Sequence, residues 1–191
     1  MSSFLAFLGF EKDFEDNLSS DIGSSIKLIS VKKGEVLQKN GDLKAKGFFV
    51  KSGLLRSYTI DNKGKEHIFM FGPEGWIVGD MEFHAGAPAT LYIDALEDSE
   101  IEVIEPSVVE EFFEKIPLEQ LPTEIKRMSN RLLVLQKRII MLMSASVLER
   151  YDDFVQTYPH IVQRVPQRMV ASYLGVTPEA LSKVKSEHLK G

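Results

Sequence analysis

The spacing of hydrophobic residues changes along the chain, and the first pattern is that of short strands. Between about residue 25 and residue 105, hydrophobic runs alternate with turn residues, as in SIKLISVKKGE, GFFVKSGLLRSYTI, KEHIFMFG and ATLYIDALEDSEIEVIE. Glycines between Gly34 and Gly86 recur at about the spacing of turns in an all-β barrel or roll. Asp61-Asn62-Lys63-Gly64 between two apolar runs is typical of a hairpin. This region therefore predicts an all-β module.

From about Thr123 to Ser144 the hydrophobic period becomes helical. Six residues follow one another at intervals of three and four: Ile125, Met128, Leu132, Leu135, Ile139 and Leu142. This is the a/d pattern of a coiled coil over nearly three heptads. Thr123 is the predicted N-cap, with Glu124 in the first turn. We expect a long dimerisation helix, although a core helix in a monomer would show the same spacing.

The last third of the chain reads as a group of shorter helices. An amphipathic helix is expected from Ser146 to Thr157, and a second one from about Pro166 to Leu174. The stretch VASYLGVTPEALSKVK then matches a helix-turn-helix: Ala171 is small where two helices cross, and Gly175 can adopt a positive φ in the turn. Thr177 can cap the following helix and Pro178 suits its first position.

The exposed face of this hairpin carries the candidate DNA-binding residues. They are Gln167, Arg168, Thr177, Pro178, Glu179, Ser182, Lys183 and Lys185, and Ser186 shares the same face. Glu179 could accept a hydrogen bond from cytosine N4, and Lys183 could donate to guanine or to phosphate. Gln167 and Arg168 would hold phosphates at the start of the first helix. Helical hairpins with a glycine turn also occur in bundles that do not bind DNA, so that alternative stays open.

The formal net charge of -5 is distributed unevenly along the chain. Residues 1–123 carry 12 Lys/Arg against 22 Asp/Glu, a net charge of -10, whereas residues 124–191 carry 11 against 6, a net charge of +5. Chance segregation of surface charge is the alternative to a functional division. Because only the local field at a docking face matters, the overall acidity does not exclude binding to nucleic acid.

Composition and motifs exclude several classes of protein. The chain has no Cys, which excludes disulfides, thiol catalysis and cysteine-ligated zinc or iron–sulfur clusters. No apolar run is long enough to span a membrane, and the first residues, MSSFLAFLGFEKDFED, make a poor signal peptide and a better short packing helix. No G-x-S-x-G, H-x-x-x-H, Walker or G-x-G-x-x-G motif is present. We expect a cytoplasmic protein that is neither an enzyme nor a metalloprotein.

Together these three regions resemble the Crp/Fnr family of bacterial transcription regulators, and ERYDDFVQTYPHIVQRVPQRMVASYLGVTPEALSKVK resembles one branch of it. The resemblance implies an α+β protein: a cyclic-nucleotide-binding-like β-roll or jelly roll, a long dimerisation helix and a C-terminal (winged) helix-turn-helix. The expected boundaries are residues 1–117, 118–144 and 145–191. A full wing hairpin after the recognition helix is not expected within these 191 residues.

The family's phosphate-binding segment corresponds to GDMEFHAGAPATLYIDALEDS. By the resemblance, the effector-pocket positions are Gly79, Asp80, Met81, Glu82, Ala89 and Thr90. Cyclic-AMP-binding members have a Gly-Glu pair where Gly79-Asp80 stands, and an arginine for the cyclic phosphate where Ala89 stands. Losing that arginine removes a bidentate, charge-assisted bond. Positive charge could otherwise come from four residues elsewhere: Lys51, Arg56, His67 or His84. We expect no response to cyclic AMP, and either another small-molecule effector or none.

The resemblance therefore predicts a homodimeric, sequence-specific DNA-binding transcription regulator without a bound cofactor. Its implied partners are a palindromic operator and RNA polymerase. The alternative is an effector-binding β-roll protein whose C-terminal helices make contacts with other proteins and not with DNA.

Overall fold

The computed structural model describes residues 3–8, 17, 22–80 and 87–188. The chain forms two compact units, residues 1–116 and residues 117–191, which we call the N-terminal unit and the C-terminal unit. Each unit is described below on its own.

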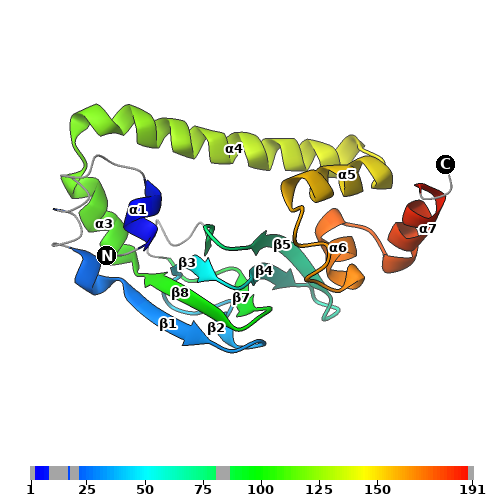
Figure 1. Ribbon diagram of the computed structural model, residues 1–191, viewed down its shortest axis with the longest axis horizontal. Helices are drawn as coiled ribbons and strands as arrows, with labels where there is room; N and C mark the ends of the chain where they lie inside the picture. The colour runs from blue at the N-terminus through cyan, green and yellow to red at the C-terminus, as the bar shows by residue number, and fades with distance from the viewer. Residues whose placement is uncertain (1–2, 9–16, 18–21, 81–86, 189–191) are drawn as a thin grey trace. The chain divides into compact units, whose positions relative to one another are not determined.

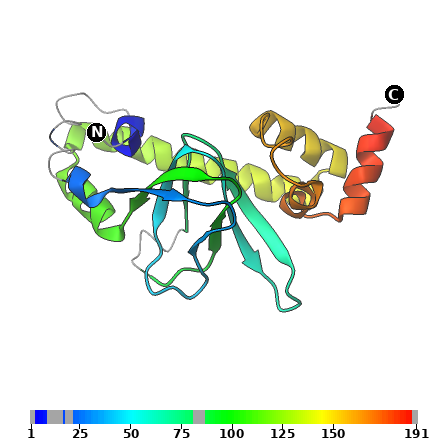
Figure 2. The ribbon, with the colours of Figure 1, turned by 60° about the horizontal axis from the view of Figure 1, so that its bottom comes forward.

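The N-terminal unit contains two four-stranded antiparallel sheets (Figures 1 and 2). One sheet has the order β1-β8-β3-β6, with β1 (Lys27–Val31), β8 (Ser99–Ile104), β3 (Gly47–Ser52) and β6 (Ile77–Gly79). The other has the order β2-β7-β4-β5, with β2 (Val36–Gln38), β7 (Tyr92–Ala95), β4 (Leu55–Ile60) and β5 (Glu66–Gly72). The β-roll predicted from the glycine-punctuated hydrophobic runs is confirmed.

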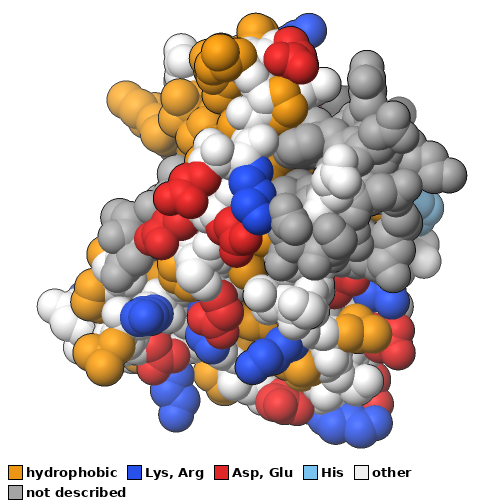
Figure 3. Space-filling view, turned by 90° about the vertical axis from the view of Figure 1, so that its left-hand side faces the viewer, with side chains coloured by type: hydrophobic (Ala, Val, Ile, Leu, Met, Phe, Trp, Pro, Cys, Tyr) orange, Lys and Arg blue, Asp and Glu red, His pale blue; other side chains and the backbone are white. Residues whose placement is uncertain are grey.

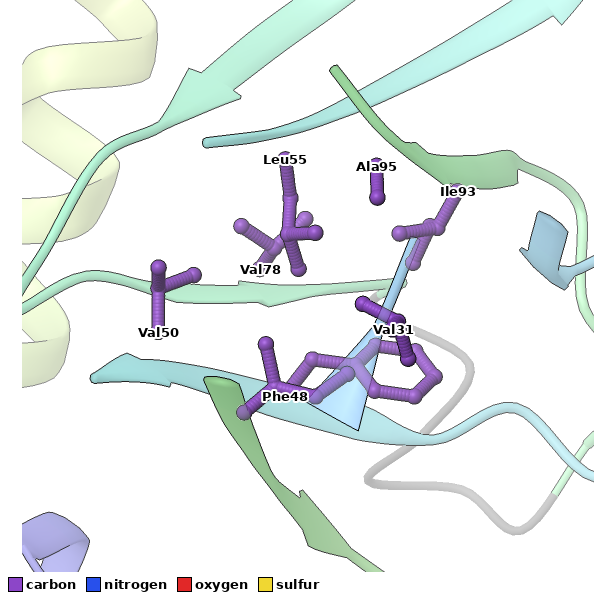
Figure 4. Close-up of a cluster of buried hydrophobic side chains, with 8 residues drawn as sticks. Val31, Phe48, Val50, Leu55, Val78, Ile93 and Ala95 are labelled. Atoms are coloured by element: carbon purple, nitrogen blue, oxygen red, sulfur yellow. The ribbon is translucent and has the colours of Figure 1, made fainter. Parts of the chain in front are cut away.

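The core of this unit lies between the two sheets (Figure 4). Because successive side chains of a strand point to opposite faces, alternate residues of facing strands meet there. The buried cluster is formed by Val31, Phe48, Val50, Leu55, Val78, Ile93, Ala95 and Ile101. Residues 61–64 connect β4 to β5 as predicted, and Gly64 takes a φ of +78° in that hairpin.

Short helices flank the sheets of the N-terminal unit. Helix α1 (Ser3–Leu8) buries Phe4 and Leu5, as predicted for the hydrophobic start of the chain. The ring of Phe4 lies 6.2 Å from that of Phe49 on β3, and the Phe4 amide donates to the buried Glu102 carboxylate at 2.7 Å. A 3-10 turn, η1 (Gly23–Ser25), precedes β1, and helix α3 (Pro106–Lys115) follows β8.

The C-terminal unit is helical, with the 3-10 turn η3 (Leu118–Gln120) leading into the long helix α4 (Leu121–Ser144). The predicted N-cap at Thr123 is wrong: the N-cap is Gln120, three residues earlier, because η3 runs directly into α4 and Pro122 fits its first turn. Three shorter helices follow: α5 (Val147–Thr157), α6 (Gln167–Leu174) and α7 (Pro178–His188). In the part of the chain that the structure describes, no helix is long and apolar enough to cross a membrane.

Candidate nucleic-acid interface

Helices α5, α6 and α7 are held together by a small core of their own. Its buried residues are Phe154, Tyr158, Ile161, Val165, Val170, Ala171, Leu174 and Leu181. The rings of Phe154, Tyr158 and Tyr173 lie 5.2–5.6 Å apart in tilted and edge-on pairs. Ala171 is completely buried, as a small residue at a helix crossing should be. This packing fixes the angle between α6 and α7.

The connection between α6 and α7 has the predicted geometry. Gly175 adopts the left-handed conformation, with φ +68° and ψ 30°, and ends α6 as its C-cap. The Val176 amide donates to the Ala171 carbonyl at 3.0 Å. The Thr177 hydroxyl accepts from the Ala180 amide at 3.2 Å, so Thr177 caps α7 and Pro178 opens it. Residues 167–188 thus form a helix-turn-helix.

An open hollow lies between the start of α6 and the exposed face of α7. It is lined by Gln167, Pro178, Glu179, Ser182, Lys183 and Ser186. Five of these are predicted DNA-binding residues, and Ser186 had been placed on the same face. The structure brings them together because Gln167 starts α6 whereas the others follow one face of α7 at helical spacing.

The remaining predicted DNA-binding residues lie around this hollow. Arg168 is exposed in the first turn of α6. Lys185 does not line the hollow: its ammonium lies 5.2 Å from the centre of the Tyr151 ring on α5. The Glu179 carboxylate accepts from its own amide and from the Thr177 hydroxyl, and these bonds hold its pKa below the usual range. Glu179 therefore stays ionised as a hydrogen-bond acceptor at the start of α7.

Two arginines of the C-terminal unit serve its internal structure. Arg150 donates to the Leu174 carbonyl at 3.1 Å and to the Ala145 carbonyl at 3.0 Å. Arg138 of α4 donates to the Tyr173 carbonyl at 3.3 Å, and its guanidinium stacks 3.9 Å from the Tyr173 ring centre. Both bind the C-terminal end of α6, where helical carbonyls lack partners. Part of the local positive charge is thus committed to holding α6 against α4 and α5.

The predicted dimer seam is an exposed apolar face of α4. Ile125, Met128, Leu132, Ile139 and Leu142 are between 38% and 65% exposed, and Leu135 is half-buried. Leu133, Val134, Ile140 and Met143 are also exposed and widen the face. Figure 3 looks along α4, and hydrophobic side chains stand out from the helix in orange. Among the described residues, these side chains form an exposed apolar face on α4.

Comparisons with known proteins agree with this architecture. Residues 28–116 match the family model described as cyclic nucleotide-binding domain. Electron transport regulator A of Shewanella oneidensis and the fumarate and nitrate reduction regulatory protein of Vibrio cholerae are each 28% identical over 169 residues. Each of these matches covers 81% of this chain and 65% of the relative.

Solved structures show the same fold. FixK2 from Bradyrhizobium japonicum has a TM-score of 0.74 at 20% identity, covering 87% of this chain and 86% of that one. A CooA mutant from Carboxydothermus hydrogenoformans has a TM-score of 0.72 at 18% identity, covering 99% and 85%. These similarities support the resemblance of the chain to the Crp/Fnr family.

The chain spans about 65% of the length of the curated relatives named above. Both of these relatives are named as regulators. The family model covers most of the N-terminal unit, so the pocket positions expected from the Crp/Fnr resemblance can be located in the β-roll. Met81 and Glu82 lie outside the described residues, as does His84.

The segment that corresponds, by the resemblance, to the phosphate-binding motif begins at the end of β6, where Asp80 follows Gly79. The Asp80 carboxylate is only 4% exposed and accepts from the Thr90 amide at 2.6 Å and the Leu91 amide at 2.7 Å. The Thr90 hydroxyl donates to both of its oxygens at 3.0 Å. Gly79 pairs with Gly47 of β3 in the sheet, which positions Asp80 at the strand end.

The other backbone groups of residues 89–91 are also bonded. The Ala89 amide donates to the Asp42 carbonyl at 2.8 Å, and the Ala89 carbonyl accepts from the Gly41 amide at 2.8 Å. The remaining two carbonyls accept from side-chain amides at 3.0 Å: Asn40 donates to Thr90 and Gln38 donates to Leu91. Residues 89–91 therefore have every backbone donor and acceptor occupied within the chain.

Two of the four side chains that could have supplied positive charge are already bound to carboxylates. Arg56 is buried and binds Asp94 through two nitrogens at 2.8 and 2.9 Å, and it also binds Glu66. Burial alone would lower the pKa of the Arg56 guanidinium, but these carboxylates raise it above its usual value. His67 is hydrogen-bonded to Asp61 at 2.9 Å, and Lys51 is exposed on β3.

By the resemblance, the groups at residues 80 and 89–91 would face the phosphate of a cyclic nucleotide, and in this chain they are bonded to one another or to neighbouring residues. Such a phosphate would need cationic or amide donors, yet residue 89 is a buried alanine and both neighbouring amides already bind a carboxylate. The negative charge of Asp80 would also repel a phosphate at this position. A cysteine-ligated iron–sulfur cluster does not fit, because the sequence has no thiol to hold it.

Proposed function

We propose that this chain is a homodimeric, sequence-specific DNA-binding transcription regulator. The observation that carries the proposal is the helix-turn-helix of α6 and α7, whose exposed hollow gathers Gln167, Glu179, Ser182 and Lys183. We assign residues 1–117 to a sensor-type β-roll, residues 118–144 to dimerisation and residues 145–191 to DNA binding.

In this proposal α7 enters the major groove with its N-terminal half. Lys183 and Ser182 contact base edges, and Glu179 accepts from cytosine N4 through oxygen lone pairs that its capping bonds leave free. Gln167, Arg168 and the capped start of α7 at Thr177-Pro178 contact phosphates. Lys185, which stacks on Tyr151, contributes by its charge near the backbone.

Dimerisation follows from the exposed apolar face of α4. Two copies that pack their a/d residues together would remove this face from water and place two copies of α7 on one DNA duplex. A twofold dimer would read a palindromic operator, with half-sites about one helical turn apart. The modest net charge of residues 124–191, +5, is doubled in such a dimer.

The sensor role is reduced in this chain. The occupied segment at residues 89–91 supports a regulator that neither binds nor responds to cyclic AMP, and we propose no resident cofactor or metal. An effector of this protein would therefore not place a phosphate group against the amides of residues 90 and 91. As a transcription regulator the protein would act in the cytoplasm and meet RNA polymerase at the promoter.

Two measurements test the proposed function. The first selects the sequences that the protein binds from a random pool of DNA duplexes, and the second measures its affinity for them over a range of salt concentrations. We expect enrichment of a palindrome and a steep fall in affinity with salt. Lys183→Ala should lower affinity for the selected site by about 1–3 kcal/mol and relax the preference at one base pair. Arg168→Ala should weaken all duplexes alike and reduce the salt slope by about one.

Lys63→Ala supplies the matched control, because Lys63 is an exposed lysine in the β4–β5 turn of the other unit. It should bind DNA as the unchanged chain does. Unaltered DNA affinity in both Lys183→Ala and Arg168→Ala, or binding without salt dependence, would refute the DNA-binding function and favour protein contacts by α6 and α7.

A further inference from the structure

The Asp80 carboxylate occupies a position that an anionic ligand could otherwise take. Two consecutive amides, those of Thr90 and Leu91, and one hydroxyl, that of Thr90, converge on it at 2.6–3.0 Å. Convergent backbone amides of this kind form anion-binding sites in proteins. The bound anion here is supplied by the chain itself, from the end of a strand ten residues earlier in the sequence.

We propose that Asp80 is a built-in anion that permanently fills an anion-binding site formed by residues 90 and 91. The site takes a carboxylate, and Asp80 makes an external anion unnecessary for keeping residues 89–91 in place. A cyclic-nucleotide-type domain that has lost its arginine thereby keeps the same segment ordered through an internal charge.

The burial of Asp80 distinguishes it from an aspartate that makes an ordinary hydrogen bond at the surface. Asp80 is 4% exposed, whereas Asp42, in the neighbouring turn, is exposed and accepts from the Lys39 amide at 2.7 Å. A buried charge without partners is strongly unfavourable, so the three donors and the carboxylate stabilise one another. Removing the carboxylate leaves two amides of residues 90 and 91 without this partner.

The test compares Asp80→Ala with Asp42→Ala in the full chain. Asp80→Ala should lower the melting temperature of the N-terminal unit by about 5–10 °C, whereas Asp42→Ala, which loses only an exposed bond, should change it little. Sodium formate, which has the size of the deleted carboxylate group, should raise the melting temperature of Asp80→Ala above that in sodium chloride of equal ionic strength. Trp76, the single tryptophan, belongs to the N-terminal unit and supplies a fluorescence reading of its unfolding.

Unchanged protein and Asp42→Ala should show no difference between formate, inorganic phosphate and chloride. Equal melting temperatures for the two variants, or a specific stabilisation of unchanged protein by formate or phosphate, would overturn the proposal. If Asp80→Ala does not fold, Asp80→Asn replaces it, because asparagine keeps the size of the side chain and one acceptor oxygen. The melting temperature of the unchanged protein in formate and phosphate still shows whether the site is open to an external anion.

One consequence rests on the proposed function: DNA affinity of the unchanged chain should be the same with and without cyclic AMP or phosphate. The melting and fluorescence experiments involve no DNA. A failure of DNA binding would therefore count against the proposed function alone, while an open anion site would count against the role of Asp80 alone.

Discussion

At residue 175 the chain turns between α6 and α7 with φ +68°, a conformation that glycine adopts without strain. A Cβ placed there would lie 3.3 Å from Leu142 of α4 and 3.8 Å from the Arg150 guanidinium. The turn therefore favours glycine for its backbone conformation, and an added Cβ would also come close to the Leu142 side chain of α4. A single residue in this way links the recognition helix to the proposed dimerisation helix.

Gly175→Ala should destabilise the C-terminal unit by about 1–2 kcal/mol and weaken DNA binding, because strain and crowding add. Gly64→Ala is the matched control, since Gly64 has φ +78° in the β4–β5 hairpin but no atom within 4 Å of an added Cβ. Chemical denaturation of both variants separates the two effects. An equal loss in both would show that crowding at residue 175 contributes nothing.

Asp61 illustrates how one turn residue responds to its neighbours. Its carboxylate accepts from His67 and from the Lys65 and Lys63 amides, and these bonds lower the pKa of Asp61 to about 2. Because the pKa is lower in the folded protein than the ordinary value of 3.8, the stabilising effect is complete above that value. It is lost as the pH falls from about 4 towards 2.

His67→Ala should therefore raise the pKa of Asp61 from about 2 towards 3.8, since the His67 hydrogen bond is its largest cause. Titration of the Asp61 carboxyl by NMR measures this directly. Lys65→Ala keeps the Lys65 amide and serves as the control. A pKa of Asp61 that is unchanged in His67→Ala would contradict this assignment.

At the scale of elements, α5 begins with a capping box. The Ser146 hydroxyl accepts from the Glu149 amide, and the Glu149 carboxylate accepts from the Ser146 amide at 2.7 Å. These bonds hold the pKa of Glu149 below its usual range. The cap lies where α4 ends, so it defines the junction between the proposed dimerisation helix and the helices that bear the proposed DNA-binding face.

Ser146→Ala should destabilise the C-terminal unit by about 1 kcal/mol at neutral pH. Because the pKa of Glu149 is lowered by folding, the contribution of its carboxylate is present above the ordinary pKa of 4.5 and decreases as the pH falls below it. The difference between unchanged protein and Ser146→Ala should thus shrink in acid. Denaturation curves at pH 7 and pH 3 measure it, and a constant difference would contradict the capping role of Glu149.

At the scale of the whole molecule, the central question is what covers the apolar face of α4. Leu132 is 65% exposed in the single chain, and so large an exposed face on one helix is characteristic of an interaction surface. In a parallel pair of α4 helices Leu132 would lie at the centre of the a/d seam. In the proposed function, the arrangement of two DNA-binding faces on one operator depends on this pairing.

Leu132→Glu should convert the dimer to a monomer, because it places two like charges inside the seam. Asn130→Glu adds the same charge on the opposite side of α4 and should leave the dimer intact. Sedimentation velocity gives the oligomeric state, and affinity for a palindrome against a half-site gives its effect on DNA binding. A monomeric unchanged protein, or equal behaviour of the two variants, would exclude α4 as the dimer interface.

Much of the architecture could be predicted from the sequence because it depends on local periodicity. Alternating runs with glycine turns predicted the β-roll, and the glycine at 175 with the threonine and proline at 177–178 predicted the helix-turn-helix. The start of α4 was missed because η3 extends the helix backwards through residues whose helical state depends on packing. The N-cap at Ser146 could have been found from its glutamate three residues later.

The sequence by itself determined the types of element, their order and the residues on the exposed face of α7, since these follow from spacing along one segment. Only the tertiary structure decided which charged side chains are engaged in contacts within the chain. Arg138 and Arg150 bind the end of α6, Lys185 lies over Tyr151, and Asp80 binds the amides of residues 90 and 91. The physical reason is that each of these partners lies at least ten residues away in the chain, and only folding brings a donor and such an acceptor within hydrogen-bonding distance.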